Sequence, residues 1–165
     1  MITLVLGGAR SGKSEVAERI AGAAGGPVTY VATASTDDGS MLARVEAHRR
    51  RRPHDWATVE VGPGGALGAA LAGLEGTALV DSLGPWLAGF PDFATDSGDL
   101  CGALLSRAGD TVVVSDEVGL GVHPSTEAGN HFRDRLGLLN RAVSLAADRV
   151  LLVVAGRALE LGGPA

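Results

Sequence analysis

Hydrophobic residues occur along most of the chain as short continuous runs bounded by Gly, Pro or Asp. The runs do not alternate apolar with polar positions, as strands with one solvent-facing side do. This pattern is typical of strands that are buried on both faces of a sheet. We predict such strands at 2–6, 28–33, 57–61, 77–81, 111–115 and 149–156.

Helical periodicity fills most of the intervals between these runs. It is clearest near the C-terminus, where Phe132, Leu136, Leu139, Val143 and Ala147 form an apolar stripe at three- and four-residue spacing. Strands that alternate with helices predict a mostly parallel sheet flanked by helices, in one α/β domain over residues 1–165. The helices are predicted at about 14–24, 39–52, 65–74, 98–108 and 126–147.

Two segments do not fit the alternation. The stretch SLGPWLAGFPDFATDSGD at 82–99 contains two prolines and several aromatic residues, and we expect a loop or lid there without a regular element. The glycine-rich end of the chain, at 162–165, is expected to fray.

Composition excludes several classes of protein. The formal net charge of −5 argues against a general nucleic-acid or membrane-surface binder, and no apolar run approaches the roughly 20 residues that span a bilayer. The first apolar run stops at a glycine after about five residues, which predicts a strand and not a signal peptide. Cys101 is the only cysteine, so an intrachain disulfide and a cysteine-rich metal site are excluded. We expect a cytoplasmic protein.

The stretch GGARSGKS at 7–14 lies between the first predicted strand and the first predicted helix. It matches the phosphate-binding loop (P-loop) pattern Gly-x4-Gly-Lys-Ser and predicts a P-loop NTPase-like fold. Glycine lets the backbone turn where side chains would collide with a polyphosphate, and backbone N–H groups then face the anion at a helix N-terminus. The predicted nucleotide-binding residues are Gly7, Gly8, Ala9, Arg10, Ser11, Gly12, Lys13 and Ser14.

Lys13 is the only lysine among the fourteen Lys and Arg residues. A compact ammonium fits inside a ring of backbone amides, where a planar guanidinium would be too bulky. The chain therefore keeps lysine where arginine cannot replace it. We predict that Lys13 contacts the β- and γ-phosphates and that the Ser14 hydroxyl is a ligand of Mg²⁺.

A phosphate-binding loop needs a carboxylate from another strand to hold Mg²⁺. Asp81 ends one predicted strand, and Asp116 and Glu117 follow another. Asp81 and the pair Asp116 and Glu117 both fit this role, because the carboxyl ends of parallel strands lie at one edge of the sheet. Either could instead cap the next element or form an ion pair with an arginine. We predict a metal site of Ser14 with Asp81 or Glu117. A GTPase switch is disfavoured, since the Asn-Lys-x-Asp guanine motif would need a second lysine.

A histidine precedes four arginines in MLARVEAHRRRRPHDW at 41–56. On a helix Arg44 and His48 share one face, and the four arginines surround the helix end. One interpretation is a solvated basic helix end with a surface histidine. In the other, the arginines gather a triphosphate, and their charge keeps His48 neutral and nucleophilic. Attack of His48 on the α-phosphate would then give a nucleotidyl-histidine and divide a difficult transfer into two steps.

The sequence resembles, nearly from end to end, the adenosylcobinamide kinase / adenosylcobinamide-phosphate guanylyltransferase family of cobalamin biosynthesis. The resemblance is carried by GGARSGKS at 7–14, YVATA at 30–34, MLARVEAHRRRRPHDWATVE at 41–60, VD at 80–81, SDEVGLGVHP at 115–124, FRDRLGLLN at 132–140 and AADRVLLVVAG at 146–156.

This resemblance implies a bifunctional enzyme that phosphorylates adenosylcobinamide with ATP or GTP. The enzyme then transfers GMP from GTP to the new phosphate and releases pyrophosphate. His48 matches the histidine that becomes guanylylated, and Lys13 belongs to the catalytic set. A homotrimer is also implied. Residues matching positions around the guanine nucleotide are Ala32, Thr33, Ala34, Arg49, Arg50, Arg51, Arg52, Glu60 and Asp81.

Some positions depart from the family's pattern. Asp116 stands where asparagine is expected, Arg141 stands where glutamine is expected, and the segment 82–99 resembles the family weakly. Two alternatives stay open from the sequence. One is a P-loop small-molecule kinase that transfers only the γ-phosphate, and the other is a non-enzymatic, nucleotide-dependent interaction module.

Overall fold

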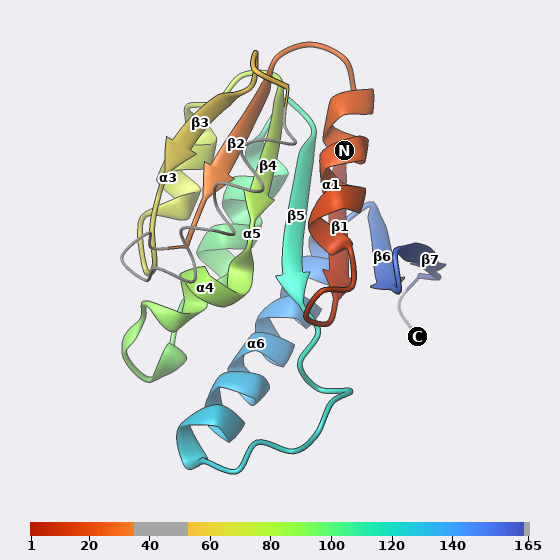
Figure 1. Cartoon of the computed structure of the whole chain (residues 1–165). Helices are drawn as coiled ribbons and strands as arrows, with labels where there is room; N and C mark the ends of the chain where they lie inside the picture. The colour runs from red at the N-terminus through yellow and green to blue at the C-terminus, as the bar shows by residue number, and fades with distance from the viewer. Residues whose placement is uncertain (35–52, 164–165) are drawn as a thin grey trace.

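A seven-stranded sheet forms the centre of the molecule (Figure 1). The computed structural model describes residues 1–34 and 53–163, so the helix predicted at 39–52 and the last two residues lie outside the described part. The strands are β1 (Ile2–Gly7), β2 (Val28–Ala32), β3 (Ala57–Glu60), β4 (Thr77–Asp81), β5 (Thr111–Asp116), β6 (Arg149–Val154) and β7 (Arg157–Leu161). Their order is β3-β2-β4-β5-β1-β6-β7, and all pairs are parallel except β6 with β7. The predicted α/β fold is confirmed.

Helices cover both faces of the sheet, with α1 on one face and the others opposite (Figure 1). Among the described residues, no helix is both long and apolar enough to cross a membrane. The helices are α1 (Lys13–Ala23), α3 (Leu67–Ala72), α4 (Leu83–Ala88), the 3-10 helix η1 (Pro91–Phe93), α5 (Ser97–Ser106) and α6 (Glu127–Ala146).

The continuous apolar runs are explained by two cores, one on each side of the sheet. In β1, Val5 packs in the core beneath α1, whereas Leu4 and Leu6 pack in the core beneath α3, α4, α5 and α6. Successive side chains of a strand point to opposite faces, so a strand covered on both sides is apolar at most of its positions. The stripe on α6 faces the second core, where Leu136 and Val143 are fully buried.

The strand predicted at 57–61 differs from the others. The structure has β3 there, but Ala57, Thr58 and Glu60 are exposed, so the predicted burial on both faces is wrong. β3 is the outermost strand of the described sheet and has a neighbouring strand only in β2. A strand at the edge of a sheet has a neighbouring strand on one side only, so its side chains are less buried than those of a central strand.

The prediction of a loop without regular elements at 82–99 is also wrong. The segment contains α4, η1 and the start of α5, and Leu83, Trp86 and Leu87 are buried in the core. The two prolines are compatible with these helices because Pro85 lies in the first turn of α4 and Pro91 opens η1. A residue in the first turn of a helix has no backbone partner to lose.

The C-terminal strand was predicted too long, and the one after it was missed. β6 ends at Val154, and a two-residue turn of Ala155 (φ 49°) and Gly156 (φ 74°) leads into β7. Two consecutive residues with positive φ give the tight turn whose twist matches an antiparallel pair. Ala155 is an unusual residue for this conformation, so the sequence carried a weak turn signal.

The carboxyl ends of the parallel strands meet at one edge of the sheet. β1, β5 and β4 are neighbours there, and their final residues are Gly7, Asp116 and Asp81. Gly7 is paired in register with Asp116. In an open parallel sheet, ligands bind outside this edge.

Candidate active site

The chain between β1 and α1 forms a tight loop at the carboxyl edge. Arg10 and Gly12 have φ values of 56° and 91°, and the N–H of Ser11 donates to the carbonyl of Gly8 at 3.2 Å. A Cβ atom on Gly7 would lie 2.8 Å from the carbonyl oxygen of Val153. Glycine is therefore required at Gly7 by packing and is favoured at Gly12 by its backbone conformation.

Gly8 is in a different situation. No protein atom of the described residues lies within 4 Å of the position that a Cβ would take. The predicted reason for this glycine, close approach to a polyphosphate, is not tested by the protein's own contacts and stays a prediction.

The turn between β6 and β7 supports the loop from its other side. The N–H of Gly156 donates to the carbonyl of Ser11 at 2.7 Å, and the Cα atom of Gly156 would lie 3.2 Å from a Cβ on Gly12. The C-terminal hairpin thus fixes the backbone immediately before Lys13.

Lys13 is the first residue of α1, and its ammonium is held by two oxygen acceptors. The Nζ atom lies 2.7 Å from Oδ1 of Asp116 and 3.3 Å from the carbonyl oxygen of Gly8. The side chain of Lys13 is 13% exposed and that of Asp116 is 31% exposed. The ammonium is therefore largely enclosed at the mouth of the loop.

Asp81 and Ser14 meet beside this loop. The hydroxyl of Ser14 donates to Oδ1 of Asp81 at 3.4 Å, and the hydroxyl of Tyr30 donates to Oδ2 of Asp81 at 3.1 Å. Tyr30 reaches this position from β2, where it is buried. Strand order explains the meeting, since β2 and β4 are neighbours and β1 leads into α1.

The oxygen set of Ser14 and Asp81 suits Mg²⁺, which takes one or two carboxylates and completes its shell with water and substrate phosphates. No cluster of three or more His, Cys, Asp or Glu side chains with the spacing of a metal site occurs in the described part of the chain. Oε1 of Glu117 accepts the N–H of Gly119 at 2.6 Å, and the backbone N–H of Glu117 donates to the carbonyl of Gly7 at 3.0 Å.

The remaining predicted residues divide into two groups. Ala32 ends β2, and Thr33 and Ala34 follow it; the buried hydroxyl of Thr33 donates to the carbonyl of Ser82 at 2.6 Å. Glu60 is exposed at the end of β3, in register with Ala32. His48 and the run 49–52 lie outside the described residues.

Sequence analysis missed three partners of the site, namely Tyr30, Gly84 and Asn140. Asn140 is buried on α6, and its Nδ2 donates to the backbone oxygen of Asp116 at 3.0 Å. Gly84 lies on α4, where an added Cβ would be 2.6 Å from Oδ2 of Asp116. Asn140 lies in the stretch 132–140, which carries part of the family resemblance. Its contact with Asp116 could not be predicted, because that contact depends on how the elements are arranged in space.

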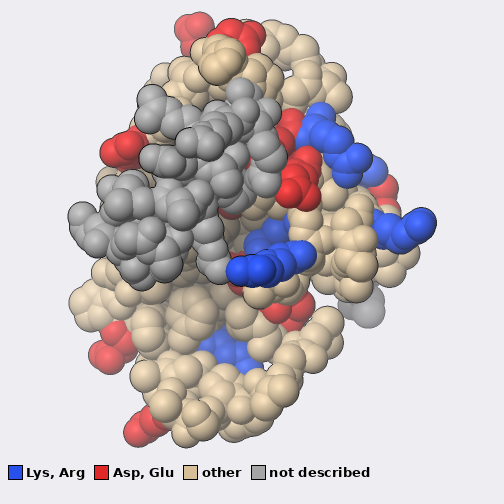
Figure 2. Space-filling view, viewed as in Figure 1, with Lys and Arg blue, Asp and Glu red and all other residues tan. Residues whose placement is uncertain are grey.

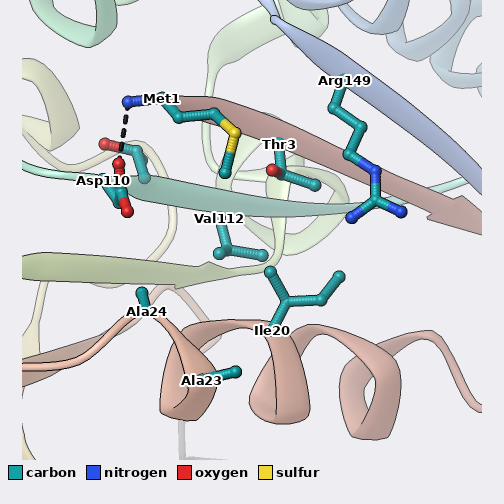
Figure 3. Close-up of a pocket in the computed structure, with 9 residues that line it drawn as sticks. Met1, Thr3, Ile20, Ala23, Ala24, Asp110, Val112 and Arg149 are labelled. Atoms are coloured by element: carbon teal, nitrogen blue, oxygen red, sulfur yellow. Dashed lines mark hydrogen bonds and ion pairs between the residues drawn. The ribbon is translucent and has the colours of Figure 1, made fainter.

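A pocket at the opposite edge of the sheet is separate from this site (Figure 3). It has a volume of about 250 Å³ and lies between α1 and the starts of β1, β5 and β6. Its charged groups are engaged in pairs: the ammonium of Met1 with Asp110 at 2.8 Å, and Arg149 with Glu160 at 2.8 Å. The hydrogen bond to Glu160 raises the pKa of Arg149.

One face of the molecule carries described side chains of both charges (Figure 2). On the face shown in Figure 2, the described acidic and basic side chains form small separate groups between wide uncharged areas.

Comparison with known proteins gives a consistent set of matches. The model of the family described as cobinamide kinase / cobinamide phosphate guanyltransferase matches residues 3–161. The bifunctional adenosylcobalamin biosynthesis protein CobP of Pseudomonas aeruginosa is 41% identical over 173 residues, which cover 99% of this chain and 98% of that protein. The protein CobU of Salmonella typhimurium is 34% identical, covering 98% and 99%, and that of Escherichia coli is 32% identical with the same coverage.

Proposed function

Because the chain belongs to the cobinamide kinase / cobinamide phosphate guanyltransferase family, an enzyme family of cobalamin biosynthesis, we propose that it catalyses both reactions itself. It first phosphorylates the free hydroxyl of adenosylcobinamide with ATP or GTP. It then transfers GMP from GTP to that phosphate, giving adenosylcobinamide-GDP and pyrophosphate. The observation that carries the proposal is the meeting of Lys13, Ser14 and Asp81 at the carboxyl edge of a chain that matches the family throughout.

In this proposal the loop at 7–14 binds the polyphosphate of either nucleotide. Backbone N–H groups and the start of α1 favour negative charge, and the Lys13 ammonium neutralises the terminal phosphates. In the kinase reaction, the acceptor oxygen bonds to the γ-phosphorus as the bond to the β-phosphate oxygen breaks. The hydroxyl proton goes to solvent, and the diphosphate leaves. Positioning and charge neutralisation supply most of the catalysis in such transfers.

Ser14 and Asp81 are proposed to hold Mg²⁺. Their hydroxyl and carboxylate oxygens fit this ion, and Tyr30 keeps the carboxylate of Asp81 in one orientation through a hydrogen bond of 3.1 Å. When bound, the ion would supply positive charge to the phosphates. Asp81 is favoured over Glu117 because Ser14 contacts Asp81.

His48 is proposed to carry the GMP. Its ring nitrogen attacks the α-phosphorus of GTP, the bond to the β-phosphate breaks, and pyrophosphate leaves. The phosphate of the corrinoid then attacks the same phosphorus, and the bond to the ring nitrogen breaks. The support lies in family membership and in the spacing of Arg44, His48 and the run 49–52.

We further propose that the enzyme works in the cytoplasm as a homotrimer and that its partners are the corrinoid and the nucleotides, with no nucleic acid. The bacterial relatives, the family resemblance and the formal net charge of −5 support this. Light scattering of the purified chain at several concentrations measures the mass directly. A monomer at all concentrations would contradict the trimer.

Labelling of the protein tests the nucleotidyl-histidine. The chain is incubated with GTP labelled on the α-phosphate and denatured, and we expect label that is lost in acid and retained in alkali. The variant His48→Ala should lose this label. His54→Ala is the matched control, because His54 is an exposed histidine six residues further on, and it should keep the label.

The same experiment separates the alternatives. Absence of label, together with ATP consumption that depends on a corrinoid alcohol, would select a kinase that transfers only the γ-phosphate. Absence of both would select a nucleotide-dependent interaction module. If both reactions occur, Lys13→Ala should reduce both, since each needs a bound polyphosphate, and His48→Ala should retain phosphorylation.

A further inference from the structure

The ammonium of Lys13 already has an anionic partner before any phosphate arrives. Oδ1 of Asp116 lies 2.7 Å from Nζ, and the ammonium is mostly enclosed. A partly enclosed ion pair has less contact with water than a surface pair, so breaking it costs more. A phosphate that binds to Lys13 must therefore displace this carboxylate or share the ammonium with it.

The surroundings of Asp116 hold it in this place. Its backbone is fixed at the end of β5 by register with Gly7 and by the hydrogen bond from Nδ2 of Asn140 at 3.0 Å. Its other carboxylate oxygen fills the space that a side chain on Gly84 would take, 2.6 Å from the position of a Cβ. The contact with Lys13 is thus part of the packing of β5, α4 and α6 and is not a chance meeting of two long surface side chains.

We infer that Asp116 is an internal competitor for Lys13, which weakens the hold of the loop on pyrophosphate and so promotes its release after GMP transfer. This inference rests on the proposed function. Pyrophosphate is the product that would occupy the loop, and it carries several negative charges close to Asp116. When pyrophosphate leaves, the carboxylate restores the charge partner of Lys13, so the empty loop does not contain an isolated ammonium.

The alternative role for Asp116 is purely structural, and it predicts a different result. A carboxylate that only stabilised the loop would leave a damaged loop on removal, and pyrophosphate would then bind more weakly. A competitor leaves a better binding site when it is removed. The direction of the change in affinity decides between the two.

The test is calorimetric titration of the full chain with magnesium pyrophosphate and, separately, with GMP. Asp116→Asn keeps the shape of the side chain and removes the charge. We expect its dissociation constant for pyrophosphate to fall by about tenfold, and the affinity for GMP to change by less than about twofold, because GMP has no terminal phosphate for Lys13. Added pyrophosphate should also inhibit GMP transfer at lower concentration than in the parent chain.

Asp110→Asn is the matched control. It removes the same charge at the opposite edge of the sheet, where Asp110 pairs with the N-terminal ammonium, and it should leave pyrophosphate affinity unchanged. Thermal melting checks that each variant is folded. Asp116→Ser also removes the charge, and we expect it to bind pyrophosphate more tightly than the parent chain, as Asp116→Asn does. It replaces Asp116→Asn if the asparagine variant does not fold.

The outcomes distinguish this inference from the function beneath it. Unchanged or weaker binding of pyrophosphate by the folded Asp116 variants, with weaker binding by Lys13→Ala, would overturn the inference and leave the phosphate-binding role of Lys13 intact. If Lys13→Ala binds pyrophosphate as well as the parent chain, the loop is not where pyrophosphate binds, and the proposed function itself fails.

Discussion

At the scale of single residues, the orientation of Asp81 depends on a neighbour outside the phosphate-binding loop. Tyr30 is buried in β2 and donates its hydroxyl to Oδ2 of Asp81, while Ser14 approaches Oδ1. A hydrogen bond to a carboxylate that holds a metal fixes the direction of its lone pairs. Tyr30 is thus a positioning residue for the proposed metal site.

Removal of that hydroxyl should affect both stability and metal affinity. Tyr30→Phe keeps the ring and is expected to lower the free energy of unfolding by about 1 kcal/mol, measured by urea denaturation. It should also raise the Mg²⁺ concentration needed for half-maximal activity. Tyr30 is the only tyrosine, so the matched control is Thr29→Val at its neighbour on the same strand, which should not change the Mg²⁺ requirement. An unchanged Mg²⁺ requirement in Tyr30→Phe would contradict the positioning role.

Single residues also show where sequence analysis reaches its limit. The loop at 7–14 could be predicted because its glycines, lysine and serine follow one another at a fixed spacing along the chain. The partner of Lys13 could not, since Asp116 lies about a hundred residues away and meets Lys13 only because β5 is the neighbour of β1. Local patterns carry no information on the order of strands.

At the scale of elements, the hairpin of β6 and β7 acts on the loop through its turn. Gly156 has a φ of 74° and donates its N–H to Ser11 at 2.7 Å. No described atom lies within 4 Å of a Cβ placed on Gly156, so a substitution there changes backbone strain and not packing. This makes Gly156 a clean position for testing the hairpin.

Gly156→Ala should lower the free energy of unfolding by about 1 kcal/mol, because an L-residue with a side chain is strained at this φ. Gly156→Asn should cost less, since asparagine tolerates the left-handed region better. Gly73→Ala is the control, because Gly73 has a φ of −89° and open space around it. Thermal melts of the three variants check the order, and equal losses for Gly156→Ala and Gly73→Ala would contradict the strain argument.

The elements were predicted unevenly for physical reasons. The six predicted strands and the helices at 14–24, 65–74, 98–108 and 126–147 agree with the structure within a few residues at each end, because continuous apolar runs and helical stripes report burial directly. α4 and β7 were missed, since a proline-containing helix of six residues and an exposed terminal strand carry little periodic signal. Short elements depend on their neighbours more than on their own sequence.

At the scale of the whole molecule, the single thiol reports on packing around α5. Cys101 packs against the core, and burial raises its pKa above the ordinary value of 9.0. The folded chain therefore holds the thiol in its neutral form more strongly than the unfolded chain does. Its contribution to stability is present below the unfolded pKa and is lost as the pH rises through the folded pKa.

Urea denaturation at pH 7.5 and pH 10 measures this linkage, and we expect the parent chain to lose more stability between these two values than Cys101→Ala. Iodoacetamide should also modify the native thiol more slowly than the thiol in the unfolded chain at the same pH, because the thiolate is the nucleophile. Equal losses of stability in the two chains would show that Cys101 is not buried enough to matter.

The position of β1 has a consequence for how the chain folds while it is being translated. β1 precedes the other described strands in the sequence, yet it lies in the middle of the sheet between β5 and β6, and its loop is completed by Gly156. During translation β1 must therefore wait until β5 and β6 have been synthesised before it finds its partners. A chain that stopped before β5 would leave β1 with two vacant edges, so the loop can hold a nucleotide only after Gly156 has been synthesised, and the incomplete sheet depends until then on protection from aggregation.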